Sequence, residues 1–182
     1  MALVILAHPN LDKSVANKTI IEELRKSNLQ LEIRNLHELY PDFKIDIQAE
    51  QQALLRHETI VFQYPFFWLS IPAILKQWFD TVFEYQFAYG SKGDKLKNKN
   101  FVSSFTIGSP ENAYQTLGKH NFRVYEFCKS IEQTAHYAQM NYTEPLYFYG
   151  ASSTGKFNTE DDIKINAKKH ANKLITKVRE LE

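Results

Sequence analysis

The stretch TIVFQYPFFWLSIPAILKQWFDTVFEY, residues 59–85, joins two patterns that together indicate one kind of fold. Residues 59–64 form a short apolar run, which is typical of a strand buried on both faces. Residues 71–85 carry apolar side chains at helical spacing, so they predict an amphipathic helix with one face against a core. That spacing places Trp78 in the core or in a subunit interface. The apolar face comprises Ile71, Ile74, Leu75, Trp78 and Val82, widened by Phe79 and Phe83.

The same strand-then-helix unit recurs along the whole chain. The expected strands cover 2–7, 31–36, 59–64, 100–108 and 145–150. The expected helices cover 14–27, 47–57, 71–85, 121–138 and 160–181. Apolar strands that alternate with amphipathic helices predict a parallel sheet covered by helices on both faces. No linker or repeat divides the chain, so we expect a single α/β domain over residues 1–182.

Composition narrows the classes of function. The 182 residues carry 22 basic and 21 acidic side chains, a net charge of +1, which disfavours a nucleic-acid binder. The single cysteine, Cys128, excludes an internal disulfide, disfavours a thiolate metal site, and is expected to be buried. The opening segment MALVILAHP lacks the basic leader of a signal peptide, and no apolar run approaches the ~20 residues of a membrane span. We therefore expect a cytoplasmic protein.

Ligands of open parallel sheets bind at the carboxyl ends of the strands, so the loops at that edge are the places to examine. The loop after the first strand leads into a helix for which Ser14 is the expected N-cap. A helix N-terminus offers unpaired N–H groups and a positive dipole end, which suit a phosphate. An alternative is that Ser14 only caps the helix, and the absence of GxGxxG disfavours a Rossmann dinucleotide site. The candidate phosphate ligands are His8, Ser14, Val15, Ala16 and Asn17.

The segment GASSTGK, residues 150–156, matches the opening positions of a P-loop. Phe157 stands where that motif needs a hydroxyl for Mg²⁺, and no further strand and helix follow to supply an acidic metal ligand. We therefore interpret the segment as a chance Gly-Ser turn, and we expect no metal site and no nucleotide hydrolysis there.

Aromatic residues gather in the loop after the third strand and beyond the helix that follows it. Packing alone rarely requires three consecutive rings between a strand and a helix, yet Phe66, Phe67 and Trp68 lie there. Phe87 and Tyr89 lie beyond the helix. Loop aromatics at the carboxyl edge of a sheet make a wall for a flat ligand. A hydrophobic cluster beneath the loops is the alternative explanation.

Several segments together resemble one family of enzymes. They are AHP…SVAN (7–17), LYPDFKIDIQAEQ (39–51), QYPFFWLSIPAILKQWFDTVFEYQFAYG (63–90) and TIGSPENAYQTLGKH (106–120). In this order they are similar to the flavodoxin-like NAD(P)H:quinone oxidoreductases. The resemblance is greatest to bacterial short-chain members, which include general stress proteins, modulators of drug activity and ancillary reductases of glutathione-gated potassium efflux. It spans nearly the whole chain and implies a flavodoxin-like three-layer α/β/α fold with a five-stranded parallel sheet.

The resemblance also implies where a flavin would lie. The flavin phosphate would occupy the first loop, at the candidate phosphate ligands named above. The ring system would contact Phe66, Phe67, Trp68 and Leu69 on one side. On the other side, the Thr-Thr-Gly-Gly loop of the family corresponds to Thr106, Ile107, Gly108 and Ser109. This chain departs from that pattern at Ile107 and Ser109, so we expect backbone N–H contacts there and no hydroxyl contact from residue 107.

Further positions match residues with roles in the chemistry of the family. Tyr114 and His120 align with its catalytic Tyr and His, while Trp68, Phe87 and Tyr89 match aromatics on the substrate side. The last two would be contributed across a homodimer interface. The implied reaction is a two-electron, ping-pong hydride transfer from NAD(P)H through the flavin to a quinone or similar aromatic acceptor. FMN is favoured, with FAD as the alternative, because the chain ends soon after the fifth helix.

Two other functions stay open from the sequence. A regulatory ancillary subunit of a glutathione-gated potassium efflux transporter would lie at the inner face of the membrane and bind that transporter. A flavodoxin-type electron carrier is disfavoured by the net charge of +1, because such carriers are typically acidic. The choice between NADH and NADPH, and among quinones, nitro compounds and azo dyes as acceptors, is also open.

Overall fold

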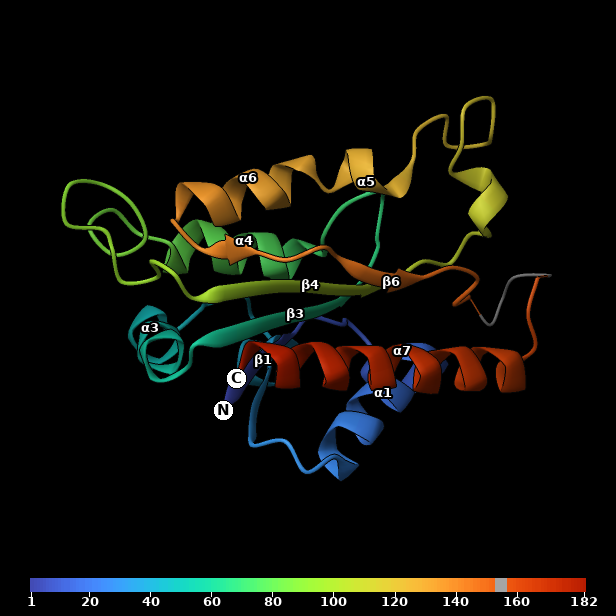
Figure 1. The fold of residues 1–182 in the computed structure, drawn as a ribbon, viewed down its shortest axis with the longest axis horizontal. Helices are drawn as coiled ribbons and strands as arrows, with labels where there is room; N and C mark the ends of the chain where they lie inside the picture. Colours follow the sequence, from blue (N-terminus) through green and yellow to red (C-terminus); the bar gives the residue numbers. More distant parts are fainter. Residues whose placement is uncertain (153–156) are drawn as a thin grey trace.

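The computed structural model describes residues 1–152 and 157–182, and it has a central sheet between two layers of helices (Figure 1). The named strands pair in parallel in the order β2-β1-β3-β4-β5, and β6 also pairs with β4. The predicted α/β fold with a parallel sheet is therefore confirmed. The strands are β1 (Ala2–Leu6), β2 (Leu31–Asn35), β3 (Thr59–Pro65), β4 (Asn100–Thr106), β5 (Asn141–Tyr142) and β6 (Leu146–Phe148).

Helices cover both faces of the sheet (Figure 1). One face packs against α1 and α7, and the other packs against α3, α4 and α6. Successive residues of β1 divide between the two faces, since Val4 joins one core cluster while Leu3 and Ile5 join the other. The helices are α1 (Val15–Lys26), α2 (Leu36–Leu39), α3 (Ile47–Arg56), α4 (Ala73–Val82), α5 (Val124–Phe127), α6 (Lys129–Tyr137) and α7 (Glu160–Leu181), with 3-10 turns η1 (Leu11–Lys13) and η2 (Glu111–Ala113).

The register of the sheet brings the carboxyl ends of its central strands to one edge. Leu6 of β1 lies opposite Gln63 of β3, and Pro65 at the end of β3 lies opposite Thr106 at the end of β4. The loops that follow these strands therefore leave the sheet side by side. This is the edge at which the sequence places the candidate ligand-binding loops.

One edge of the sheet differs from the prediction. The expected strand 145–150 is reduced to β6, and a second short strand, β5, precedes it. β5 pairs with the start of β4 and β6 with its end, so the two share one edge position. Pro145 lies between them, and proline has no backbone N–H to donate to a ladder. Pro145 thus separates β5 from β6, and the apolar pattern of residues 145–150 does not show this break.

Two expected helices have different bounds. The expected helix 121–138 is split at Cys128 into α5 and α6. Cys128 itself is 2% exposed, so its predicted burial is confirmed. The expected helix 71–85 begins at Ala73 with Pro72 as its N-cap. Ser70 lies outside the helix, and its backbone N–H and C=O are both bonded to Phe67. The bounds of α7 are as predicted.

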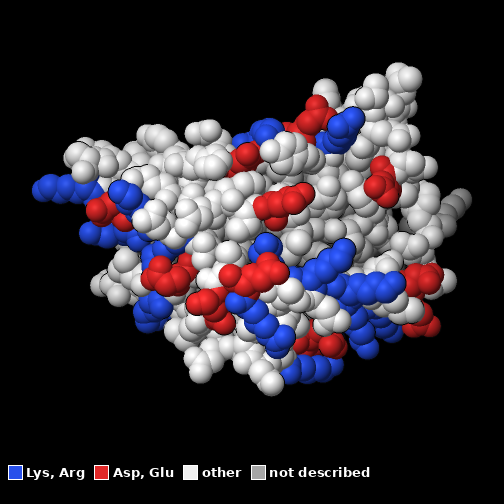
Figure 2. Space-filling model, in the orientation of Figure 1, with Lys and Arg blue, Asp and Glu red and all other residues white. Residues whose placement is uncertain are grey.

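Charged side chains are unevenly distributed over the surface. On the face shown in Figure 2, Lys and Arg gather on the lower half, over the helix layer that contains α7. The upper half, over α4 and α6, carries more uncharged surface. Among the described residues, no helix combines the length and the apolar character needed to cross a bilayer.

A buried carboxylate joins the second strand to the helix layer on one face. Glu50 of α3 is fully buried and accepts hydrogen bonds from Arg34 Nε and Nη2 at 2.8 and 2.6 Å. The Tyr40 hydroxyl donates to it at 2.6 Å and the indole N–H of Trp78 at 2.8 Å. Trp78 is itself fully buried within the chain, so of the two predicted places, core or subunit interface, it takes the core. Burying a charge is costly unless it is fully hydrogen-bonded, and here the donors meet that requirement.

Replacing Glu50 with Gln is expected to lower the free energy of unfolding by roughly 3 kcal/mol, because it leaves the half-buried Arg34 guanidinium with only the more exposed Glu32 carboxylate, 3.2 Å away, as counter-charge. The amide nitrogen of the new side chain would also face a donor. Urea denaturation measures the change.

Glu23→Gln is the matched control for this variant. It removes the same charge from an exposed ion pair with Lys26, whose N–O distance is 3.0 Å. Exposed pairs contribute at most about 1 kcal/mol. Equal losses in the two variants would contradict the role given to Glu50.

Candidate functional site

The loops at the carboxyl edge of the sheet enclose a pocket of about 450 Å³. They follow β3, β4 and β6 and bring together residues that are far apart in the sequence. Most of the lining residues are ones that the sequence analysis singled out. The pocket is lined by Phe66, Trp68, Leu69, Gly108, Ser109, Tyr114, His120, Ser152 and Phe157.

The N-terminus of α1 has the features of an anion seat. Ser14 is the N-cap, as predicted, and its hydroxyl oxygen accepts the backbone N–H of Asn17 at 3.1 Å. The N–H groups of Val15 and Ala16, in the first turn, have no partner within the helix. No acidic residue lies in that first turn to repel an anion. The end of the helix therefore offers donors and a positive dipole end together.

His8 lies on the same loop as a neutral hydrogen-bond donor. Its Nδ1 accepts the backbone N–H of Asn10 at 3.1 Å, which places the ring proton on Nε2. Burial, together with the nearby His37, lowers the pKa of His8 to about 4. The ring is therefore uncharged at neutral pH and can donate through Nε2 to a ligand.

A chain of buried, hydrogen-bonded polar side chains connects the anion seat at the N-terminus of α1 to β3 and β4. Gln63 of β3 donates from Nε2 to Asn17 Oδ1 at 2.9 Å, and Asn17 Nδ2 donates to Ser14 Oγ at 3.1 Å and to Thr106 Oγ1 at 3.0 Å. At the other end, the hydroxyl of Ser104 in β4 donates to Gln63 Oε1 at 2.6 Å. Gln63 and Ser104 were missed by the sequence analysis. The available sign was a polar residue within an otherwise apolar strand.

The aromatic loop after β3 is a tight turn in a strained conformation. Phe67 and Ser70 exchange backbone hydrogen bonds of 3.1 and 3.0 Å, and the two residues between them, Trp68 and Leu69, have φ of 47° and 64°. Two positive φ angles are typical of a type I′ turn, which normally requires Gly or Asn. The side chain of Trp68 is 99% exposed at the mouth of the pocket. The turn therefore presents a large ring that makes almost no contact with its own chain.

Ser109 joins the two predicted catalytic side chains. The rings of Tyr114 and His120 are stacked with centroids 4.4 Å apart, and His120 Nε2 lies 3.2 Å from Ser109 Oγ. The side chain of Tyr114 also interacts with that of Ser109, and burial raises the pKa of Tyr114. The departure from the family pattern at position 109 thus supplies the oxygen atom that both side chains share.

Ile107 is the exception among the loop residues after β4. Its side chain is fully buried in the core and its backbone N–H donates to Phe148 O at 3.0 Å. The expectation of a backbone N–H contact from Ile107 is therefore not met. Gly108 and Ser109 line the pocket in its place.

Phe87 and Tyr89 lie away from the pocket of their own chain. They belong to the segment between α4 and β4, which lies at the amino ends of the strands (Figure 1). The Tyr89 ring packs against Tyr137 with centroids 5.5 Å apart. A single chain does not bring these two residues to the site, so their contribution across a homodimer stays a prediction.

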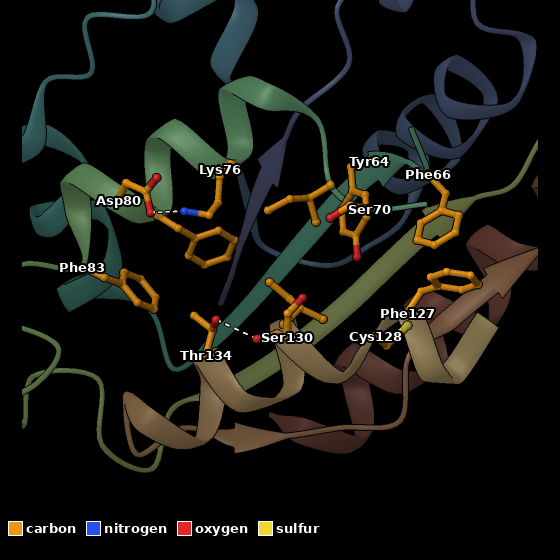
Figure 3. Close-up of a pocket in the computed structure, with 13 residues that line it drawn as sticks. Tyr64, Phe66, Ser70, Lys76, Asp80, Phe83, Phe127, Cys128, Ser130 and Thr134 are labelled. Atoms are coloured by element: carbon orange, nitrogen blue, oxygen red, sulfur yellow. Dashed lines mark hydrogen bonds and ion pairs between the residues drawn. The ribbon is translucent and has the colours of Figure 1, made fainter. Parts of the chain in front are cut away.

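A second cavity of about 300 Å³ lies between α4 and α5–α6. Figure 3 shows aromatic rings such as Phe83 and Phe127 around it, with the ion pair of Lys76 and Asp80 on α4. It shares Phe66 with the first pocket. It has neither an anion seat nor a stacked Tyr–His pair, so it is not the candidate site.

Residues 153–156 of the P-loop-like segment lie outside the described residues.

The strain at Trp68 leads to a stability prediction. A non-glycine residue in the left-handed region costs roughly 1–2 kcal/mol, and Asn tolerates that region better than Trp. Because the Trp68 side chain is exposed, Trp68→Asn is expected to raise the free energy of unfolding by about 1 kcal/mol. Trp68→Val is the control and should lower it, since β-branched residues avoid positive φ. Urea melts in which both variants shift in the same direction would contradict this account.

Comparisons with known proteins agree with this architecture. A family described by its flavodoxin-like fold matches residues 1–174. The uncharacterized NAD(P)H oxidoreductase YrkL of Bacillus subtilis is 39% identical over 167 residues, covering 92% of this chain and 93% of the relative. The glutathione-regulated potassium-efflux system ancillary protein KefG of Erwinia tasmaniensis is 37% identical over 149 residues, covering 82% and 80%.

Solved structures give the same result. General stress protein 14 of Treponema denticola, solved in complex with FMN, has a TM-score of 0.88 at 30% identity and covers 100% of this chain and 99% of its own. The NADPH-quinone reductase of P. pentosaceus has a TM-score of 0.75 at 25% identity and covers 94% and 97%. From the family match and these relatives along nearly its whole length, the chain belongs to the family with the flavodoxin-like fold.

Proposed function

We propose that this flavin-dependent oxidoreductase is an FMN-containing NAD(P)H:quinone oxidoreductase that works as a homodimer. The observation that carries the proposal is the convergence of three features at one edge of the sheet. These are the anion seat at the N-terminus of α1, the exposed ring of Trp68, and the stacked pair of Tyr114 and His120. A similar protein bound to FMN and a relative named as an NAD(P)H oxidoreductase support it.

The residues present fit the phosphate of FMN. Ser14 Oγ and Thr106 Oγ1 each accept from the Asn17 side chain, which leaves their own hydroxyl protons available to donate to another acceptor. His8 Nε2 and the first-turn N–H groups of α1 add further donors. The pocket volume of about 450 Å³ lies within the range of small-molecule sites.

When bound, FMN would accept a hydride from NAD(P)H and pass two electrons to the acceptor. The protein holds the reacting partners between Trp68 and the loop after β4, with flat aromatic surfaces that suit both nicotinamide and quinone rings. Gly108 and Ser109 offer backbone N–H groups on that loop. Preorganised donors of this kind stabilise developing negative charge without reorganisation.

Tyr114 and His120 would handle protons at the same place. The raised pKa keeps the Tyr114 hydroxyl protonated, so it can donate a hydrogen bond to developing negative charge. His120 Nε2 lies 3.2 Å from Ser109 Oγ, which also contacts Tyr114, so a proton can pass between the two side chains through that hydroxyl. Phe87 and Tyr89 of a second chain would close the substrate side.

The absorbance spectrum of the purified protein, before and after anaerobic addition of NADPH, tests the proposal. Flavin bands near ~370 and ~450 nm that bleach on reduction are expected, with FMN released on denaturation. A menadione-type quinone should then restore the bands. A purified protein that binds no flavin after incubation with FMN or FAD would contradict the proposed enzyme function.

Tyr114→Phe should slow the reduction of bound flavin by roughly 10- to 100-fold, because loss of one donor to developing charge can cost up to about 10²–10³. The dissociation constant of FMN should change little. Tyr125→Phe, which removes a hydroxyl from an exposed ring on α5, is the control and should reduce at the wild-type rate. Stopped-flow absorbance measures both. Wild-type kinetics in Tyr114→Phe would remove this hydroxyl from the mechanism.

A further inference from the structure

His170 of α7 is a buried histidine that the mechanism above does not use. It is 3% exposed and its Nε2 lies 2.8 Å from the hydroxyl oxygen of Ser104. Ser104 is the end of the polar chain that supports the anion seat. The chain therefore runs without a break from α7, through β4 and β3, to the N-terminus of α1.

The donors and acceptors along this chain all point in one direction. Ser104 donates to Gln63 Oε1, so its oxygen can accept a proton from His170 Nε2. Gln63 then donates to Asn17, and Asn17 donates to Ser14 and Thr106. In this direction the hydroxyl protons of Ser14 and Thr106 are left over, and they can donate to an anion.

The same heavy atoms allow the opposite direction. If His170 carried its proton on Nδ1, then Nε2 would accept from Ser104. The amides of Gln63 and Asn17 would turn over, and Asn17 Oδ1 would accept from the hydroxyls of Ser14 and Thr106. Those two donors would then be lost to a ligand. A phosphate dianion only accepts hydrogen bonds, so it requires the first direction.

The surroundings of His170 favour the first direction. Burial and the charge of Lys173 lower the pKa of His170 to about 4, so the ring is neutral and carries one proton. His170 lines a cavity of about 360 Å³ together with Lys169, Lys173 and Glu111. Because Nε2 is engaged with Ser104, Nδ1 is the ring nitrogen that remains to respond to the charges around this cavity, and of these the charge of Lys173 acts on the ring. A neighbouring ammonium favours a lone pair there over an N–H group.

We propose that His170 is a positioning residue for the flavin phosphate, and that Lys173 holds its ring in the Nε2–H tautomer. Through Ser104, Gln63 and Asn17, this tautomer keeps the hydroxyl protons of Ser14 and Thr106 directed at the phosphate. The inference rests on the proposed function, because it takes a flavin phosphate as the occupant of the seat.

Nitrogen-15 NMR of histidine-labelled, flavin-free protein reads the tautomer directly, in the wild type and in Lys173→Glu. The wild type should show His170 as Nε2–H. Lys173→Glu replaces the positive charge that acts on the ring with a negative one, and should shift the ring toward the Nδ1–H form at pH 8. A wild-type ring in the Nδ1–H form, or a tautomer that Lys173→Glu leaves unchanged, would overturn the proposal.

The second readout is the ratio of the dissociation constants of riboflavin and FMN, which isolates the phosphate. Lys173→Glu should lower the preference for FMN by about tenfold or more, because hydrogen bonds to the charged phosphate are lost. Lys168→Glu is the matched control: it makes the same charge change on an exposed residue of α7 that does not line the cavity. In a His170→Phe background, Lys173→Glu should have no further effect on the ratio. Equal ratios in wild type, Lys168→Glu and Lys173→Glu would overturn the proposal.

The proposed function and the role given to His170 can be tested separately. A wild-type protein that binds neither FMN nor riboflavin contradicts the proposed function. In that case the tautomer and the affinity for inorganic phosphate, followed by phosphorus-31 NMR, still test the polar chain on its own. Weaker binding of inorganic phosphate in Lys173→Glu than in Lys168→Glu would support it, and equal binding would overturn it.

Discussion

The hydrogen bond between Gln63 and Asn17 is the interaction on which the candidate site depends. Both side chains are almost fully buried, and a buried amide without partners costs about 1–3 kcal/mol. The requirement to pair them fixes the first turn of α1 against the end of β3. The anion seat is thus placed at the carboxyl edge by the same bond that satisfies the core. The Gln63–Asn17 hydrogen bond therefore contributes both to the stability of the core and to the position of the anion seat.

Much of the fold could be predicted from the sequence because it follows from repeated apolar patterns. The bounds of α7, the central strands and the burial of Trp78 follow from periodicity alone. The broken edge strand and the split at Cys128 could not, since they depend on which ladder positions the neighbouring strand β4 offers. The partners of Glu50 come from three separate segments, so no local pattern indicates them.

The site was predictable to the extent that one segment decides it. Ser14 as N-cap is a local property, and the loop aromatics are visible as a cluster. The positive φ of Trp68 was not, because Trp carries no preference for that region. Ser104 and His170 act through partners on other elements, so their spacing in the sequence has no meaning before the fold is known. Whether Phe87 and Tyr89 complete the site depends on a second chain.

Cys128 gives this protein a built-in probe of its own opening. The thiol is nearly inaccessible, and burial raises its pKa to about 11, so hardly any thiolate exists in the native state. A thiol reagent too large for the cavity that Cys128 borders can react at an appreciable rate only after the α5–α6 junction has separated from the sheet. Because the chain has a single cysteine, the labelling rate reports the opening of that one layer without interference. The rate at which the helices that cover β4 open can therefore be measured in the unmodified protein.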